Sequence, residues 1–209
     1  MASIYDLKPK FQALLRPVCT WLAGVGVTAN QVTIAALLLS LAYGAAFSIT
    51  GARVFLILLP VFLFLRMAMN AIDGMLAREF DQKSNAGAIL NELSDVIADA
   101  ALYLPFALIA GMPAELIVIA VIVAIIAEMS GVITVMIGAS RRYDGPFGKS
   151  DRAFFFGALG LALGFGLNLE NWIMWLFWGA TALSVLTMIN RARAGLKEAG
   201  KKMGSETDG

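Results

Sequence analysis

Residues 70–99 read NAIDGMLAREFDQKSNAGAILNELSDVIAD, and this stretch decides the fold. It joins two apolar segments, 53–77 and 87–110, each long enough to cross the hydrocarbon core of a membrane, about 30 Å thick, as a helix. Carboxylate and amide side chains lie inside both segments. Ionisable residues are costly within a bilayer and are usually retained there because they serve a function.

The composition extends this interpretation to the whole chain. Of its 209 residues, 59% are hydrophobic and 15% are charged, whereas soluble domains carry about 25% charged residues. Six apolar runs lie at 31–50, 53–77, 87–110, 114–138, 152–167 and 171–190. None shows the apolar and polar alternation of a barrel strand, so helices are expected. The sequence therefore predicts an all-α polytopic membrane protein with six transmembrane helices.

The two ends of the chain differ from these runs. Residues 3–22 mix Lys and Arg with aromatic and aliphatic side chains, which predicts an N-terminal amphipathic interfacial helix. Residues 195–209 are polar and predict a disordered cytoplasmic tail. We find no internal repeat, so residues 1–194 are expected to form one membrane domain.

Charged residues indicate orientation and exclude some functions. The 16 Lys and Arg nearly balance the 15 Asp and Glu, so there is no basic footprint for nucleic acid. Cations lie before the first run, between the second and third, between the fourth and fifth, and after the sixth. The positive-inside rule then places both termini in the cytoplasm, and we expect a bacterial inner membrane. The chain has no histidine and a single cysteine, which excludes imidazole chemistry and an intramolecular disulfide.

The polar residues of 70–99 share helix faces. Asn91, Asp95 and Asp99 follow one another at intervals of four, and Asn70 and Asp73 are three apart. Such oxygen donors suit a hard divalent cation, Mg²⁺ or Mn²⁺. Each acid alone could equally be a hydrogen-bonded structural residue, or the set could form an ion or proton pathway. The acids are confined to one end of the two helices, which argues against a pathway.

This segment resembles the signature of the CDP-alcohol phosphatidyltransferase family. That signature is Asp, two residues, Asp-Gly, two residues, Ala-Arg, eight residues, Gly, three residues, Asp, three residues, Asp. Six positions match with every spacing preserved: Asp73, Gly74, Ala77, Arg78, Gly87 and Asp95. Asn70 and Asn91 stand at the first and third Asp positions.

The resemblance implies an activity. A CDP-linked lipid such as CDP-diacylglycerol would be attacked by an alcohol acceptor at the phosphorus next to the lipid, with release of CMP. Asp95 would take the proton of the alcohol, and Arg78 would lie near the nucleotide phosphates. The implied metal ligands are Asp73, Asn70, Asn91 and Asp95, and Asp99, one turn beyond the signature, is a further candidate. The implied nucleotide-binding residues are Asn30, Thr33, Asp73, Gly74, Ala77, Arg78 and Gly87. The resemblance also implies a homodimer.

The two Asn residues leave alternatives open. They remove two negative charges, so the chain would bind divalent ions more weakly, and one metal in place of two is a reasonable hypothesis. Asp99 is a better candidate than Glu92 to restore charge, because it shares the face of Asn91. The alternative is a catalytically altered relative that binds CDP-lipid or a membrane partner without turnover.

Two further segments are less specific. VTANQVT at 27–33 resembles the family's entry to its first helix, although capping by Thr28 or Asn30 explains it equally well. RRYDGPFGKSDRA at 141–153 places Lys149 and Arg152 where they suit an anionic acceptor, or simply forms a positive-inside loop. Glu128 either pairs with Arg66 or lines the acceptor pocket. The sequence does not identify the acceptor alcohol.

Overall fold

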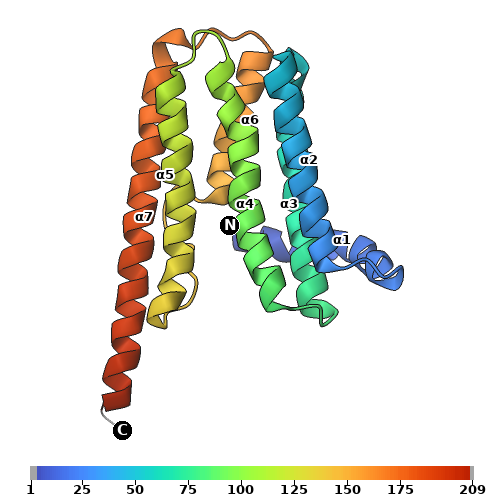
Figure 1. Cartoon of the computed structure of the whole chain (residues 1–209), viewed down its shortest axis with the longest axis vertical. Coiled ribbons are helices and arrows are strands. Elements are labelled where there is room, and N and C mark those ends of the chain that lie inside the picture. Colours follow the sequence, from blue (N-terminus) through green and yellow to red (C-terminus); the bar gives the residue numbers. More distant parts are fainter. Residues whose placement is uncertain (1–3, 208–209) are drawn as a thin grey trace. The chain divides into compact units, whose positions relative to one another are not determined.

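A computed structural model describes the backbone of residues 4–207 and the side chains of residues 10–202. Within residues 4–207 every regular element is helical and there is no strand, which confirms the all-α prediction (Figure 1). The elements are α1 (Ile4–Gly24), α2 (Ala29–Thr50), α3 (Arg53–Glu79), α4 (Asn85–Tyr103), η1 (Leu104–Leu108), α5 (Ala114–Ile133), η2 (Thr134–Ile137), α6 (Lys149–Gly164) and α7 (Glu170–Thr207).

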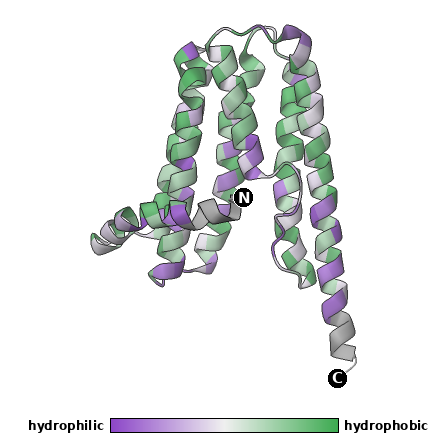
Figure 2. Ribbon diagram, turned by 180° about the vertical axis from the view of Figure 1, so that it is seen from behind, coloured by the Kyte–Doolittle hydropathy of each residue, from purple (hydrophilic) through white to green (hydrophobic). Residues whose placement is uncertain are grey.

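Four of the described helices are long and apolar enough to cross a membrane. They comprise Ala29–Thr50, Arg53–Glu79, Ala114–Ile137 and Glu170–Lys202. Figure 2 shows hydrophobic residues along most of their length and hydrophilic residues along the C-terminal part of α7. The helix α6 has only 16 residues, and α4 carries three acidic residues, so neither meets the same requirement of length and composition. Six spans therefore stay a prediction.

The chain divides into two compact units. The first unit contains the chain up to Ile49 together with Val61–Leu102, and the second contains Thr50–Pro60 and the chain from Tyr103 onward. One boundary falls at Pro60, inside α3. Proline lacks the N–H that an uninterrupted helix needs at that position, so the helical hydrogen bonding is locally weakened there.

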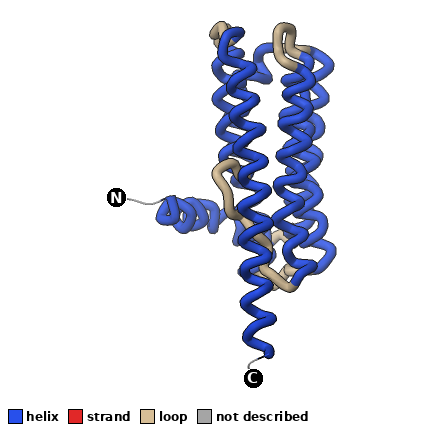
Figure 3. Tube along the Cα trace, turned by 90° about the vertical axis from the view of Figure 1, so that its left-hand side faces the viewer, coloured by secondary structure: helices blue, strands red, loops and turns tan. Residues whose placement is uncertain are grey.

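The first unit packs α1 across the paired helices α2 and α3, as Figures 1 and 3 show. Its core joins these three helices through Cys19, Ala29, Val32, Ile72, Met75 and Leu76. Burial raises the pKa of the Cys19 thiol, so it behaves as a small apolar side chain. A Cβ on Gly44 would overlap the carbonyl oxygen of Ala101, so glycine is required for the close approach of α2 and α4.

The second unit has an aromatic core. The ring of Phe156 stacks on Tyr103 with centroids 4.0 Å apart and contacts Phe177 at 5.9 Å. Gly160 lets α6 lie close to the backbone of Leu56, because a Cβ there would be 3.1 Å from the carbonyl oxygen. The helices α5 and α7 lie side by side (Figure 1). Small residues and aromatic stacking therefore pack these helices closely.

The C-terminal segment differs from the disordered tail that its polar sequence predicts. The helix α7 continues to Thr207, so most of the segment 195–209 is helical and not disordered. Glu198 accepts hydrogen bonds from the backbone N–H (3.0 Å) and hydroxyl (2.7 Å) of Ser140, and Lys202 donates to the carbonyl oxygen of Gly138 at 2.8 Å. These contacts stabilise helix in a polar sequence. Residues 208–209, residue 3 and the side chains of 4–9 lie outside the described part, so the interfacial role of α1 stays a prediction.

Candidate active site

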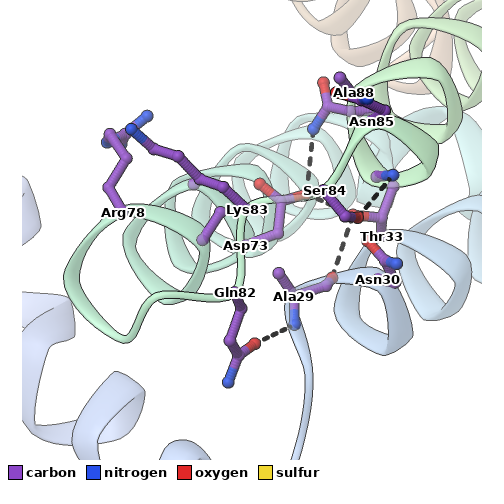
Figure 4. Close-up of a pocket in the computed structure, with 14 residues that line it drawn as sticks. Ala29, Asn30, Thr33, Asp73, Arg78, Gln82, Lys83, Ser84, Asn85 and Ala88 are labelled. Carbon is purple, nitrogen blue, oxygen red and sulfur yellow. Dashed lines mark hydrogen bonds between the residues drawn. The ribbon is translucent and has the colours of Figure 1, made fainter.

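A cavity of about 520 Å³ opens in the first unit where three helices end or begin. Its walls come from the start of α2, the end of α3, the connecting loop and the start of α4 (Figure 4). The residues that line it are Ala29, Asn30, Thr33, Asp73, Gly74, Ala77, Arg78, Gln82, Lys83, Ser84, Asn85, Gly87, Ala88 and Asn91. All seven residues implied as nucleotide-binding, and Asn91, are therefore brought together in one cavity.

Asp73 is the acidic residue of this cavity, and its side chain is held by neutral donors. The residue is 2% exposed. The hydroxyl of Thr33 lies 2.8 Å from Asp73 Oδ2, and the amide nitrogen of Asn91 lies 3.4 Å from the same oxygen. These hydrogen bonds stabilise the carboxylate, and its place in the lining of the cavity suits it to bind a cation.

The start of α2 explains the placement of Asn30. Thr28 and Gln31 bond reciprocally: the Thr28 N–H donates to Gln31 Oε1 at 2.9 Å, and the Gln31 N–H donates to Thr28 Oγ1 at 3.3 Å. This is a capping box with Thr28 as the N-cap. Of the two residues suggested as the cap of this helix, Thr28 is therefore the one that caps it. Asn30 is not needed for capping and lines the cavity.

A second helix begins at the same cavity. The N–H of Gly87 donates to the hydroxyl of Ser84 at 3.0 Å, so Ser84 caps α4. A Cβ on Gly87 would lie 2.6 Å from Oδ1 of Asn30, so glycine lets α4 approach the start of α2. The positive ends of two helix dipoles therefore meet at one cavity, and such ends attract phosphate.

Cations and an amide complete the cavity. Arg78 and Lys83 are exposed, and Figure 4 shows their side chains reaching toward the same side of the opening. The amide of Gln82 reaches the start of α2, where its Oε1 accepts the N–H of Ala29 at 2.7 Å, drawn as a dashed line in Figure 4. The connecting loop thus contributes Gln82 and Lys83, and it turns at Asp81, whose φ is +54°. Neither Gln82 nor Lys83 is part of the family signature.

The remaining predicted metal ligands form a network with Arg66 in the same unit, in which Arg66 and Asp99 are buried and Asn70 and Asp95 are half-buried. Arg66 of α3 bonds to the carboxylate of Asp99 and, through Nη2, to the backbone oxygen of Asp95 at 3.0 Å and Asp95 Oδ1 at 3.5 Å. The amide nitrogen of Asn70 donates to Asp95 Oδ1 at 3.2 Å. None of Asn70, Asp95 and Asp99 is among the residues that line the cavity. The pairing of Arg66 with these acids is the feature that the sequence analysis missed.

The donor set limits the kind of metal site the chain can form. Among the described side chains, no three His, Cys, Asp or Glu gather closely enough to hold a metal ion. Asp73 supplies one carboxylate, and Asn91 supplies an amide oxygen if its amide group rotates. These groups fit a hard cation that takes only one or two protein carboxylates and completes its shell with water and phosphate, as Mg²⁺ commonly does.

The second unit contains the loop from which an acceptor site was predicted. Arg152 and Arg191, 2% and 1% exposed, both bond to Glu128 Oε1, at 3.0 and 3.2 Å. Arg141 lies 3.5 Å from Glu128 Oε2. Glu128 thus pairs with three arginines of its own unit, whereas Arg66, the partner named in one of its two suggested roles, binds Asp95 and Asp99 in the first unit. Lys149 is half-buried at the start of α6, and the acceptor role of Lys149 and Arg152 stays a prediction.

The described residues form helices without strands, four of the helices are long and apolar enough to cross a membrane, and a cavity lies at two helix N-termini, which favour phosphate groups. Residues 26–186 match the CDP-alcohol phosphatidyltransferase family. The chain belongs to this family, as the spacing of residues 70–95 indicated.

Known proteins give two kinds of similarity. The chain is 46% identical over 195 residues to the inner membrane protein YnbA of Escherichia coli (strain K12), covering 92% of this chain and 96% of that protein. It has the fold of phosphatidylinositol phosphate synthase PgsA1 from Mycobacterium tuberculosis. The TM-score is 0.70 for the crystal structure with CDP-DAG bound, at 19% identity over 88% of this chain and 92% of the other. For the complex with manganese and citrate it is 0.71, at 19% identity over 86% and 88%.

Proposed function

We propose that this chain transfers a phosphatidyl group from CDP-diacylglycerol, or a similar CDP-linked lipid, to an alcohol acceptor and releases CMP. Membership of the family supports the reaction class. The observation that carries the proposal is the cavity of about 520 Å³, in which all seven residues implied as nucleotide-binding lie together.

The cavity suits a CDP headgroup for physical reasons. The pyrophosphate would lie at the N-termini of α2 and α4, where backbone N–H groups and helix dipoles favour anions. Arg78 and Lys83 at the opening would neutralise its charge. Asn30 and Thr33 would bind the nucleoside portion beside Gly87, whose lack of a side chain leaves room.

Asp95 would act as the base. The acceptor oxygen forms a bond to the phosphorus next to the diacylglycerol, the bond from that phosphorus to the bridging oxygen breaks, and CMP leaves with that oxygen. The hydroxyl proton passes to the Asp95 carboxylate. Positioned general bases contribute about 10²- to 10⁴-fold to such reactions. Asp95 is 23% exposed, so the carboxylate is partly accessible to a substrate.

A divalent cation would bind at Asp73. Mg²⁺ or Mn²⁺ held there with Asn91 would neutralise charge on the pyrophosphate and on the departing CMP. One carboxylate and amides make a weak site by themselves, so we propose that one metal binds together with the CDP-lipid. Thr33 holds Asp73 in place through its hydroxyl, 2.8 Å from Oδ2.

The remaining parts of the proposal concern the acceptor and the membrane. Lys149 and Arg152 would bind an anionic group of the acceptor. Arg152 already donates a hydrogen bond to Glu128, so the anionic group would compete with this carboxylate. The chain would lie in a bacterial inner membrane with six spans, an interfacial α1 and both termini in the cytoplasm. The similarity to an inner membrane protein supports this location. A homodimer is also proposed, on the resemblance alone.

The test is direct. Purified protein is incubated with CDP-diacylglycerol, Mg²⁺ or Mn²⁺ and a panel of alcohols, and CMP is measured. We expect CMP release that depends on one class of alcohol and on the metal. Replacing Asp95 by Asn should reduce turnover by about 10²- to 10⁴-fold with little change in CDP-diacylglycerol binding. Unchanged turnover would remove Asp95 as the base.

A second candidate is a relative that binds CDP-lipid without turnover. The observation that favours it is the donor set: Asn70 and Asn91 are neutral, and Asp99 is paired with Arg66. Such a protein would bind CDP-diacylglycerol and release no CMP with any alcohol. That result in the assay would replace the first proposal by the second.

A further inference from the structure

Arg66 connects α3 to two successive turns of α4 in the first unit. It is 4% exposed although it is an arginine. Nη1 donates to Asp99 Oδ1, whereas Nη2 donates to the backbone oxygen of Asp95 at 3.0 Å and lies 3.5 Å from Asp95 Oδ1. A guanidinium is a rigid planar fork, so one group can bridge both sites at once, which the single nitrogen of lysine cannot do.

The two acids have unequal parts in this network. Asp99 is 8% exposed at its side chain and makes the shorter contact, so it is the principal counter-ion of Arg66. Asp95 is 23% exposed at its side chain and makes the longer ion pair. Asn70 adds a second donor, with its amide nitrogen 3.2 Å from Asp95 Oδ1. Arg66 and Asn70 therefore both hold the same oxygen of Asp95.

We propose that Arg66 is a positioning residue for Asp95. With Asn70, it fixes the rotation of the carboxylate through Oδ1, and this rotation sets how the carboxylate meets the proton of the acceptor hydroxyl. Asp99 serves as the counter-ion of Arg66 and is not a metal ligand. Asn70 acts as a hydrogen-bond donor to Asp95. This role rests on the proposed transferase function.

A purely structural ion pair would behave differently on substitution. Removing one partner of a buried pair leaves an uncompensated charge and destabilises the fold, but replacing both partners by apolar residues of similar size often restores stability. A positioning role is not restored in this way, because the apolar pair cannot hold Asp95 Oδ1. Turnover per folded molecule therefore separates the two roles.

The experiment compares the wild type, Arg66→Met, and the double variant Arg66→Met with Asp99→Leu. Thermal unfolding in detergent should show a loss in the single variant and recovery in the double variant. We expect the double variant to keep its KM for CDP-diacylglycerol and to lose about 10- to 100-fold in kcat, the size of effect expected from a misplaced reacting group. A double variant that regains full turnover together with stability overturns the proposal.

Two further variants show whether a loss of activity comes from misfolding. Arg66→Lys keeps the charge and should fold, yet it should recover only part of kcat; full activity would contradict the need for a forked donor. Arg16→Met removes an exposed pair with Glu79, whose side chains are 56% and 37% exposed, and is the matched control with unchanged kcat.

A binding measurement provides a readout besides activity. Mn²⁺ is titrated into wild type and double variant in the presence of CDP-diacylglycerol. We expect equal affinities, because Asp99 pairs with Arg66; a tenfold or larger loss would assign Asp99 to the metal and overturn its role as counter-ion. If the wild type releases no CMP, the proposed transferase function is overturned, and the role of Arg66 with it. If the wild type is active and the double variant is equally active, only the role of Arg66 is overturned.

Discussion

Asp73 in the first unit and Glu128 in the second are buried to a similar degree, at 2% and 7% exposure, yet different kinds of side chain contact their carboxylates. Thr33 and Asn91, both neutral, donate to Asp73. Glu128 contacts three guanidinium groups, from Arg141, Arg152 and Arg191.

The difference distinguishes a carboxylate placed for binding from one placed for packing. Asp73 lines a cavity in which a cation can approach it, and Thr33 and Asn91 donate hydrogen bonds to it. The arginines of Glu128 come from three parts of the chain, the loop after η2, α6 and α7, so the carboxylate ties these elements to α5. Substitutions at the two acids should therefore affect different properties.

The largest effect is expected at Glu128. Replacing it by Leu leaves three buried or half-buried arginines without their shared carboxylate, and breaking a buried pair in this way costs about 3–5 kcal/mol. Thermal or denaturant unfolding in detergent measures the loss. Glu115→Leu, an exposed glutamate in the first turn of the same helix, is the control and should change stability far less. Equal effects of the two substitutions would remove the distinction between the clusters.

A substitution at Asn91 sharpens the other side of the comparison. Asn91→Asp adds a carboxylate next to Asp73 and should tighten Mn²⁺ binding about tenfold or more, the factor that corresponds to 1.4 kcal/mol. Asn70→Asp should have a smaller effect, because Asn70 contacts Asp95 and does not line the cavity. Asn85→Asp places the same charge elsewhere in the lining and serves as control. If all three variants bind Mn²⁺ equally, Asp73 and Asn91 do not form the site.

The local part of the site was predictable from sequence. Residues three or four apart on a helix lie on one face, so placing Asn70 and Asp73 on one helix and Asn91 and Asp95 on the next needs no knowledge of tertiary structure. The side chains nevertheless pair across the helices, Asn70 with Asp95 and Asn91 with Asp73. The helical fold class was also predictable, because each apolar run is local in the sequence and none alternates like a barrel strand. The signature spacing also marked residues of the cavity, since Asp73, Gly74 and Gly87 all line it.

Pairings between distant segments were not predictable. Arg66 and Glu128 are both buried ions, and which acid meets which arginine depends on the rotation of each packed helix. Gln82 reaches Ala29 only because the loop turns at Asp81 in the left-handed region, a conformation that composition does not reveal. The helical end of α7 depends on Ser140, 58 residues away from Glu198, whereas the polarity of the segment alone suggested disorder.

The hydrogen bonds at the start of α2 should each matter less than the buried ions. Thr28→Ala removes the N-cap of α2 and should lower stability by about 1 kcal/mol. Because Asn30 and Thr33 follow within the first turns, CDP-diacylglycerol binding should weaken as well. Thr28→Ser keeps the hydroxyl and is the control. A loss as large as that of Glu128→Leu would show that hydrogen bonds, and not buried ions, dominate the stability of the chain.

The smallest effect is expected where ions of the second unit are exposed. Arg142 binds Asp144 with two contacts, 2.8 and 2.9 Å long, but the side chain of Asp144 is 40% exposed. The hydrogen bonds from Arg142 lower the pKa of Asp144 below its usual value. Its contribution to stability is therefore present above the usual aspartate pKa, near 4, and is lost as the pH falls through the lower value of the folded state. At neutral pH, Asp144→Asn should shift the unfolding temperature by less than about 2 °C, and added salt should reduce even this shift, because exposed pairs are screened. A larger shift that salt leaves unchanged would mean that exposed and buried ion pairs stabilise this unit alike. The larger effect expected at Glu128 would then come from its three arginines and not from its burial.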